Sequence, residues 1–226
     1  MGVNRVAHSI WEKASLVQKS EPRGLPPRNP QCILQGMSHV FALLKSWTCY
    51  GQWLPGDHRG YVSNTLTSEG YREKRNQPNT PCDRSDSATY RRARELQKSE
   101  TVRLSAEQAI IAAAAMIEAA IDREWLIIRG AIMANHVHIL VTNCPDDGPA
   151  VRRVLKGTSQ AALSRSVGKP RKWWTTGGSD RYKHGHVAVA AAVNYVANQE
   201  YPLVLIVENE LVLPSTGACP PGPPPT

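Results

Sequence analysis

Apolar positions gather into a few short runs separated by polar segments, and these runs predict the strands. Residues 39–48 are mostly apolar with β-branched and aromatic members, which predicts a buried first strand. Residues 125–133 and 136–142 predict two strands that pair as a hairpin, because the asparagine at the 134–135 junction tolerates turn dihedral angles. A last strand is predicted to begin within residues 169–174.

Three segments predict helices. Ser105 and Gln108 have the S-x-x-Q spacing of a capping box, and the alanine, isoleucine and methionine run that follows to Asp122 contains neither proline nor glycine. Residues 150–165 have one apolar face, and residues 187–198 are rich in alanine. The resulting order is strand, helix, strand, strand, helix, strand, helix. This is the split βαβ order of an α+β, ferredoxin-like or RRM-like antiparallel sheet with helices on one face, extended by one C-terminal helix.

The polar segments set the expected domain limits. Residues 1–36 are rich in proline and charge and predict a disordered leader, and residues 214–226 predict a disordered proline-rich tail. A single domain is expected over residues 37–213. Within it, residues 57–103 are polar and charged, which predicts a surface insertion with one helix near residues 87–99, or simply a solvated charged face.

Composition narrows the class of protein. The chain has 226 residues, of which 41% are hydrophobic and 20% charged, values that suit a globular domain and exclude a wholly disordered chain. Lysine and arginine number 27 against 19 aspartate and glutamate, a net charge of +8 that favours a polyanionic partner, although solubility alone could explain it. The five cysteines are scattered without a C-x-x-C pair, so we expect a reducing cytoplasm. The longest apolar stretch contains charged and imidazole side chains, so no membrane span is expected.

The most specific chemical feature is the pair His136 and His138. Alternation along a strand places both imidazoles on one face and Val137 on the other. Two imidazoles on one face are half of a divalent-metal site, although a pair satisfied by ordinary hydrogen bonds is the alternative. A second pair, His184 and His186, is separated by glycine among polar residues, which favours a loop and argues against a ligand pair.

Tyr195 and Gln199 lie four residues apart at the end of the last predicted helix, so the phenol and the amide can share a face. A tyrosine on a helix is more often a core residue than a nucleophile. The combination with the strand histidines changes this expectation, because two imidazole nitrogens and one amide oxygen leave positions open on Mg²⁺ or Mn²⁺ for a phosphate oxygen.

Residues 133–141, Met-Ala-Asn-His-Val-His-Ile-Leu-Val, resemble the Met-Pro-Asn-His-Val-His-Leu-Leu-Val signature of the HUH endonucleases, with Ala134 in place of the proline. The similarity is to the single-tyrosine transposases of small bacterial insertion sequences and their REP-associated relatives. Residues 47–60 resemble an opening segment of one branch of these proteins, and the likeness extends over about residues 37–207. This chain has Gln199 followed by glutamate, which is more similar to the transposase branch. The REP-associated branch usually has Asn-Pro at this position.

The resemblance implies a set of roles. In that family the two histidines and the residue four places after the tyrosine bind the metal, which implies His136, His138 and Gln199 as ligands of Mg²⁺ or Mn²⁺. Tyr195 then corresponds to the nucleophile on a catalytic C-terminal helix, which forms a 5′-phosphotyrosine with single-stranded DNA that bears hairpins, in nicking and strand transfer. Members of the family can be dimers with shared active sites, so a homodimer is an expected possibility.

Basic and aromatic side chains in the second half of the chain are candidates for DNA contacts. The candidates for phosphate binding are Arg152, Arg153, Lys156, Arg171 and Lys172. The candidates for stacking on unpaired bases are Trp173, Trp174 and Tyr182. A solvated surface for the basic residues and a core position for the tryptophans are the alternatives.

Two other functions compete with the transposase. A catalytically decayed or domesticated relative could bind nucleic acid through the same basic surface without cutting it. A histidine-dependent phosphohydrolase fits poorly, because nucleotide hydrolases of the histidine-triad type need a third alternate histidine where this chain has Leu140. The two-histidine phosphoesterases need serine or threonine two residues after each histidine, which this chain lacks after His136.

Overall fold

The structure is a computed structural model that describes residues 41–59, 66–67, 70–71, 84–145 and 147–214, all within one compact unit of residues 39–226. The leader predicted over residues 1–36 and all but the first residue of the predicted tail lie outside the described residues. Part of the predicted insertion also lies outside them; its described part contains the two-residue strands β2 (Leu66–Thr67) and β3 (Gly70–Tyr71), which pair with each other.

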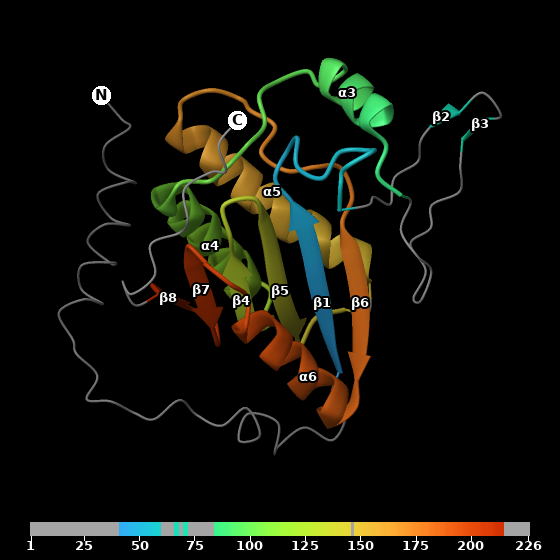
Figure 1. Cartoon of the computed structure of the whole chain (residues 1–226). Helices are drawn as coiled ribbons and strands as arrows, with labels where there is room; N and C mark the ends of the chain where they lie inside the picture. Colours follow the sequence, from blue (N-terminus) through green and yellow to red (C-terminus); the bar gives the residue numbers. More distant parts are fainter. Residues whose placement is uncertain (1–40, 60–65, 68–69, 72–83, 146, 215–226) are drawn as a thin grey trace. The chain divides into compact units, whose positions relative to one another are not determined.

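A six-stranded antiparallel sheet forms the centre of the α+β unit, in the order β6-β1-β5-β4-β7-β8 (Figure 1). Its strands are β1 (Phe41–Thr48), β4 (Leu126–Ile132), β5 (His136–Thr142), β6 (Ser179–His184), β7 (Val204–Val207) and β8 (Glu210–Val212). The described helices are α3 (Ser87–Glu95), α4 (Ala106–Ile121), α5 (Gly148–Ser166) and α6 (Gly185–Ala197). The predicted hairpin of residues 125–142 is confirmed as β4 and β5.

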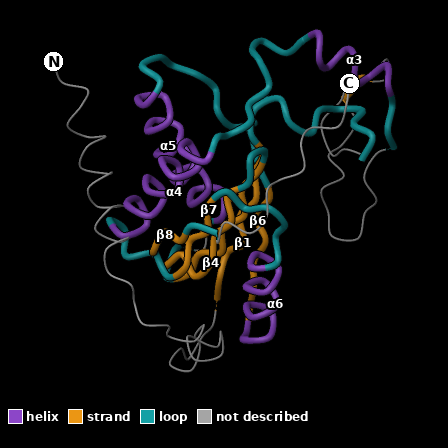
Figure 2. The backbone as a smooth tube through the Cα atoms, turned by 60° about the vertical axis from the view of Figure 1, so that its left-hand side comes forward, coloured by secondary structure: helices purple, strands orange, loops and turns teal. Residues whose placement is uncertain are grey.

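Two crossovers explain where the helices lie. β1 and β4 each pair antiparallel with β5, so they run parallel to each other, and α4 connects them across the strand between. In the same way α5 connects β5 to β6 across β1. Because such crossovers are right-handed, α4 and α5 cover the same face of the sheet. Helix α6 lies on the opposite face, as Figure 2 shows.

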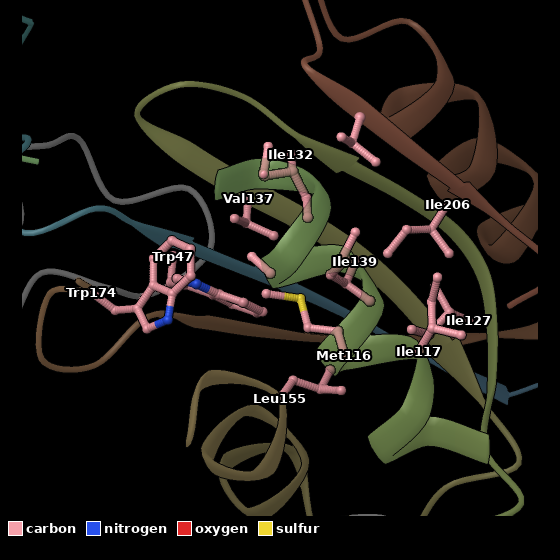
Figure 3. Close-up of a cluster of buried hydrophobic side chains, with 14 of the residues drawn as sticks. Trp47, Met116, Ile117, Ile127, Ile132, Val137, Ile139, Leu155, Trp174 and Ile206 are labelled. Carbon is pink, nitrogen blue, oxygen red and sulfur yellow. The ribbon is translucent and has the colours of Figure 1, made fainter. Parts of the chain in front are cut away.

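The main core lies between the sheet and the pair α4 and α5. Val137, Ile139 and Val141 of β5 belong to it and are fully buried, as alternation along the strand requires. Figure 3 shows the first two of these side chains. Met116 of α4 and Leu155 of α5 meet them from the helix side. This face of β5 is therefore apolar throughout, and the histidines of the same strand occupy the other face.

Local signals in the sequence account for where the two helices begin. The capping box predicted for α4 is confirmed: Ser105 Oγ accepts from the Gln108 N–H at 3.2 Å, and Gln108 Oε1 accepts from the Ser105 N–H at 3.1 Å. Helix α5 begins at Gly148, two residues before the predicted start, because the Asp147 side chain caps it by accepting from the Ala150 N–H at 3.1 Å.

The expectation of a strand that begins within residues 169–174 was wrong. Residues 169–174 do not begin a strand; apart from one bridge between Cys49 and Trp174 they are irregular, and the strand begins only at Ser179. The physical reason is that both indoles of this segment are bonded to α5, where Ser164 Oγ and Ser159 Oγ each accept an indole N–H at 3.2 Å. The segment follows the helix as a result.

The predicted loop at residues 184–186 was also wrong, because His184 ends β6 and α6 begins at the next residue. Helix α3 is shorter than the predicted residues 87–99. The final strands β7 and β8 were not predicted and extend the sheet beyond β4. No helix among the described residues combines the length and the apolar character of a membrane span.

Candidate active site

The two strand histidines lie together on the α6 face of β5. The ring centres of His136 and His138 are 5.0 Å apart and the ring planes are nearly perpendicular, at 85°. His138 is buried and His136 half-buried. The alternation of β5 thus places both imidazoles on the face predicted from the sequence.

Each imidazole is oriented by a bond at its Nδ1 atom. Asn135 Oδ1 lies 2.6 Å from Nδ1 of His136 and accepts a hydrogen bond from the Nδ1–H group. Ser46 Oγ lies 2.6 Å from Nδ1 of His138, and Ser46 is the register partner of His138 on β1. The Asn135 oxygen can only accept, which places a proton on Nδ1 of His136, whereas the Ser46 hydroxyl can donate or accept and therefore orients the His138 ring without selecting its tautomer. Oxygen partners at the second ring nitrogen are typical of histidines that bind metals.

Helix α6 brings Tyr195 to the same place. The ring of Tyr195 meets the ring of His138 edge to face, with centres 5.2 Å apart and planes at 81°. The flanking Val193 and Val196 are buried against the sheet, whereas Tyr195 itself is 49% exposed. Tyr195 is therefore anchored by its neighbours and remains open to a ligand from solvent.

Gln199 follows the end of α6 and reaches back to the site. Its Nε2 donates to the Tyr195 carbonyl at 2.9 Å, and its side chain also hydrogen-bonds His136. The Tyr195 ring thus lies against His138, and the Gln199 amide against His136. All four residues belong to one chain.

Burial makes the neutral form of both imidazoles the stable one. It lowers the pKa of His138 to about 4, and the neighbouring His136 lowers it further. Burial also lowers the pKa of His136; the side-chain hydrogen bond with Gln199 opposes this shift, and the positive charge of Arg59 adds to it. Neutral imidazole is the form that binds a metal ion.

The donor set fits a divalent cation that also binds a phosphate. Within the described part of the chain, no group of three or more histidine, cysteine, aspartate or glutamate side chains converges, so the candidate for a third ligand beside the two imidazoles is the amide oxygen of Gln199. Two neutral imidazoles and an amide bring no negative charge. A donor set of this kind would bind Mg²⁺ or Mn²⁺ weakly by itself and more tightly with an anionic phosphate oxygen as a further ligand.

Two of the predicted DNA-binding residues are engaged within the protein. Arg152 forms an ion pair with Asp180 of β6. Lys156 donates to the carbonyls of Thr175 at 2.5 Å and Gly177 at 2.7 Å, and burial lowers its pKa to about 8. These contacts tie α5 to β6 and to the loop before it, a structural role that the sequence pattern did not reveal.

The other three predicted residues are more accessible. Arg153 and Lys172 are exposed, while Arg171 is half-buried with its guanidinium 5.0 Å from the centre of the Trp173 ring. Four basic residues and no acidic one line an open hollow at the C-terminal end of α5: Arg165, Lys169, Arg171 and Lys172. This surface suits a phosphate backbone.

The expectation of base stacking is wrong for both tryptophans. Trp173 is fully buried and Trp174 is 3% exposed, so neither ring can meet a base. Tyr182 is 43% exposed, and its hydroxyl accepts from the Gly148 N–H at 3.3 Å. The weak pair His184 and His186 lies at the other end of β1, where His184 is the register partner of Phe41.

Ser46 and Arg59 were missed as site residues. No motif identifies Ser46, because its contact with His138 depends on the register between two strands. Arg59 falls in the opening segment noted in the sequence, but only the fold brings its charge near His136. Comparison of the chain with protein-family models, with curated proteins and with solved structures finds no match.

Proposed function

We propose that this protein is a metal-dependent enzyme that nicks and rejoins single-stranded DNA through Tyr195, in the manner of a single-tyrosine HUH transposase. The observation that carries the proposal is the contact of the Tyr195 ring with His138 on a face where His136 and Gln199 also meet. If Tyr195 were buried, or if the two imidazoles pointed away from each other, no place would remain for a metal ion and a phosphate.

The topology supports the same proposal. Two crossovers that each skip one strand, with both helices on one face, are the features of a ferredoxin-like sheet. We assign the unit to that class, with α6 as an added C-terminal catalytic helix and with β7 and β8 as an extension. Neither Cys49 nor Cys144 of the described residues forms a disulfide, which suits a reducing cytoplasm, where we expect the protein to act.

The reaction can be written from the residues of the chain. His136, His138 and Gln199 would hold a Mg²⁺ or Mn²⁺ ion, which when bound draws charge from a non-bridging oxygen of the scissile phosphate. Tyr195 Oη attacks phosphorus and loses its proton to water. The bond from phosphorus to the 3′ oxygen breaks, and that oxygen leaves with the electron pair and takes up a proton. The products are a 5′-phosphotyrosine and a free 3′-hydroxyl.

Rejoining is the same step in reverse. The phosphotyrosine keeps one phosphodiester bond for each bond broken, so the 3′-hydroxyl of a second strand can attack it and release Tyr195 without ATP. Ser46 and Asn135 contribute by holding the imidazole rings in one orientation. Because Tyr195 and the histidines meet within one chain, the proposed reaction needs no second subunit.

The experiment is adduct formation on hairpin-bearing single-stranded oligonucleotides in Mg²⁺ or Mn²⁺, with wild-type protein and Tyr195→Phe. We expect a band resistant to denaturation with the wild type only, and similar DNA affinity for both proteins. Equal adducts from both proteins would contradict the role of Tyr195.

A non-catalytic nucleic-acid-binding protein is the second candidate, favoured by the basic hollow at the end of α5. Salt-sensitive hairpin binding that is insensitive to metal, without any adduct, would select this function.

A further inference from the structure

Arg59 is held in place by its own loop. The carboxylate of Asp57 accepts from Arg59 Nε at 2.8 Å and Nη2 at 2.7 Å, and from the Arg59 backbone N–H at 3.0 Å. The guanidinium also lies 5.0 Å from the centre of the Trp53 ring, a cation–π contact. Asp57 is only 5% exposed, so it is a fixed anchor and the guanidinium has little freedom to turn.

This loop leaves the sheet beside the paired imidazoles. Thr48, the last residue of β1, is the register partner of His136. The next residue, Cys49, donates its N–H to the Asn135 carbonyl at 2.8 Å. Figure 1 shows the loop at the end of β1, near the start of β5.

Residues in and beside α3 hold this loop through hydrogen bonds and close backbone packing. The Asp86 N–H donates to the Gly56 carbonyl at 3.1 Å, and a Cβ atom at Gly56 would collide with the backbone of Asp86 and Tyr90. Gln52 Nε2 donates to the Val102 carbonyl at 2.9 Å. Residues at the start of α3 and after its end therefore contact the loop. These contacts restrict the position of Arg59.

Among the described residues, one edge of the guanidinium has no hydrogen-bond partner. Asp57 takes Nε and Nη2, whereas Nη1 has no hydrogen-bond acceptor among the described residues, and 43% of the Arg59 side chain is exposed. The neighbouring imidazoles and the Gln199 amide are neutral. Arg59 is thus a fixed positive charge, with N–H groups in a planar fork, beside a site proposed to hold a polyanion.

We propose that Arg59 is a phosphate-binding residue that donates to a backbone phosphate of single-stranded DNA next to the phosphodiester attacked by Tyr195. Asp57 and Trp53 act as its positioning residues. The location of that phosphate rests on the proposed function, but its binding requires no reaction and can be measured separately.

The test measures binding in the Tyr195→Phe background, with EDTA present, so that no cleavage can occur. The probe is a single-stranded oligothymidylate of about 20 nucleotides, and its affinity is read by fluorescence anisotropy over a range of KCl concentrations. We expect Arg59→Ala to weaken binding about five- to tenfold, and to lower the slope of log affinity against log salt by about 0.7, the value for one phosphate contact on a single strand.

Two further variants complete the design. Arg123→Ala is the matched control, because Arg123 also stacks on a tryptophan, at 5.7 Å from the Trp125 ring centre, but precedes β4 at the end of the sheet far from His136. We expect its affinity and salt slope to equal those of the parent. Arg59→Lys keeps the charge and an ion pair with Asp57 but loses the planar fork, so we expect severalfold weaker binding with an unchanged slope.

The outcomes separate the two proposals. Unchanged affinity and slope in a folded Arg59→Ala protein would overturn the phosphate site, whether or not the wild type forms an adduct. If Arg59→Ala does not fold, parent-like affinity of Arg59→Lys would overturn it instead. A loss of affinity and slope specific to Arg59, in a protein whose wild type forms no adduct, would support the phosphate site and count against the nicking function.

Discussion

The ring of Tyr195, on the last helix of the unit, meets the ring of His138, on a central strand, with 5.2 Å between their centres. This contact depends on buried valines that fix α6 on the sheet and on Ser46, which fixes the imidazole. The proposed nucleophile and a proposed metal ligand are thus brought together by residues to which we assign no part in the chemistry.

Ser46→Ala tests that support. Removing the hydroxyl frees His138 Nδ1, so we expect Mn²⁺ affinity and the cleavage rate to fall about 10- to 100-fold. The control is Thr142→Val, which removes a hydroxyl bonded to the Phe41 carbonyl at the other end of β5. Equal losses in both variants would mean that Ser46 contributes stability and no orientation of the imidazole.

The neutral donor set predicts that metal binding depends on DNA. Titration of Mn²⁺, followed by electron paramagnetic resonance, should show tighter binding with a hairpin oligonucleotide present than without it. Gln199→Ala and His136→Ala should each weaken that binding at least about tenfold. His184→Ala, at the far end of β1, should not change it. Unaltered Mn²⁺ binding in the first two variants would exclude them as ligands.

The pair of Asp57 and Arg59 predicts a pH dependence of stability. The hydrogen bond from Arg59 lowers the pKa of Asp57 from 3.8 to about 2. Stability gained from the charged carboxylate is therefore fully present above about pH 4 and is lost as the pH falls toward 2. Asp57→Asn should cost about 1–2 kcal/mol at pH 7, allowing for the solvent around Arg59. Urea unfolding should show this difference shrinking by pH 2.5, and a constant difference would contradict the assignment.

Two glycines predict opposite effects of added side chains. A Cβ at Gly157 of α5 would meet no atom within 4 Å, so Gly157→Ala should stabilise the protein by about 0.5–1 kcal/mol. A Cβ at Gly130 of β4 would lie 2.9 Å from Ile139 Cδ1 and 3.0 Å from Ile206 Cβ, so Gly130→Ala should destabilise it by about 1–3 kcal/mol. Thermal or urea unfolding checks both: a stabilising Gly130→Ala would contradict the packing of β4, and a destabilising Gly157→Ala would contradict the open space beside α5.

Local signals predicted much of this fold. The capping box at Ser105 marks the start of α4, and the apolar runs on either side of residues 134–135 predict β4 and β5. The segment with Trp173 and Trp174 misled the prediction, because its apolar character serves packing against α5 and no strand pairing. Tertiary contacts of this kind leave no periodic pattern in the sequence.

Only the relationships within each pair of candidate site residues could be predicted from the sequence. Strand alternation pairs His136 with His138, and helical spacing relates Tyr195 to Gln199. The contact between these two pairs depends on how α6 packs on the sheet, and the contribution of Ser46 depends on strand register. Neither relationship can be predicted from residues that are close in sequence.

The most direct test is to identify the atom that carries the DNA. Wild-type protein is allowed to react with a hairpin-bearing single-stranded oligonucleotide in Mn²⁺, the covalent complex is digested with protease and nuclease, and the modified peptide is sequenced by mass spectrometry. The account predicts a nucleotide joined through its 5′-phosphate to Tyr195, and a released fragment that ends in a 3′-hydroxyl. Attachment to another side chain, a fragment ending in a 3′-phosphate, or the absence of any covalent complex would contradict it.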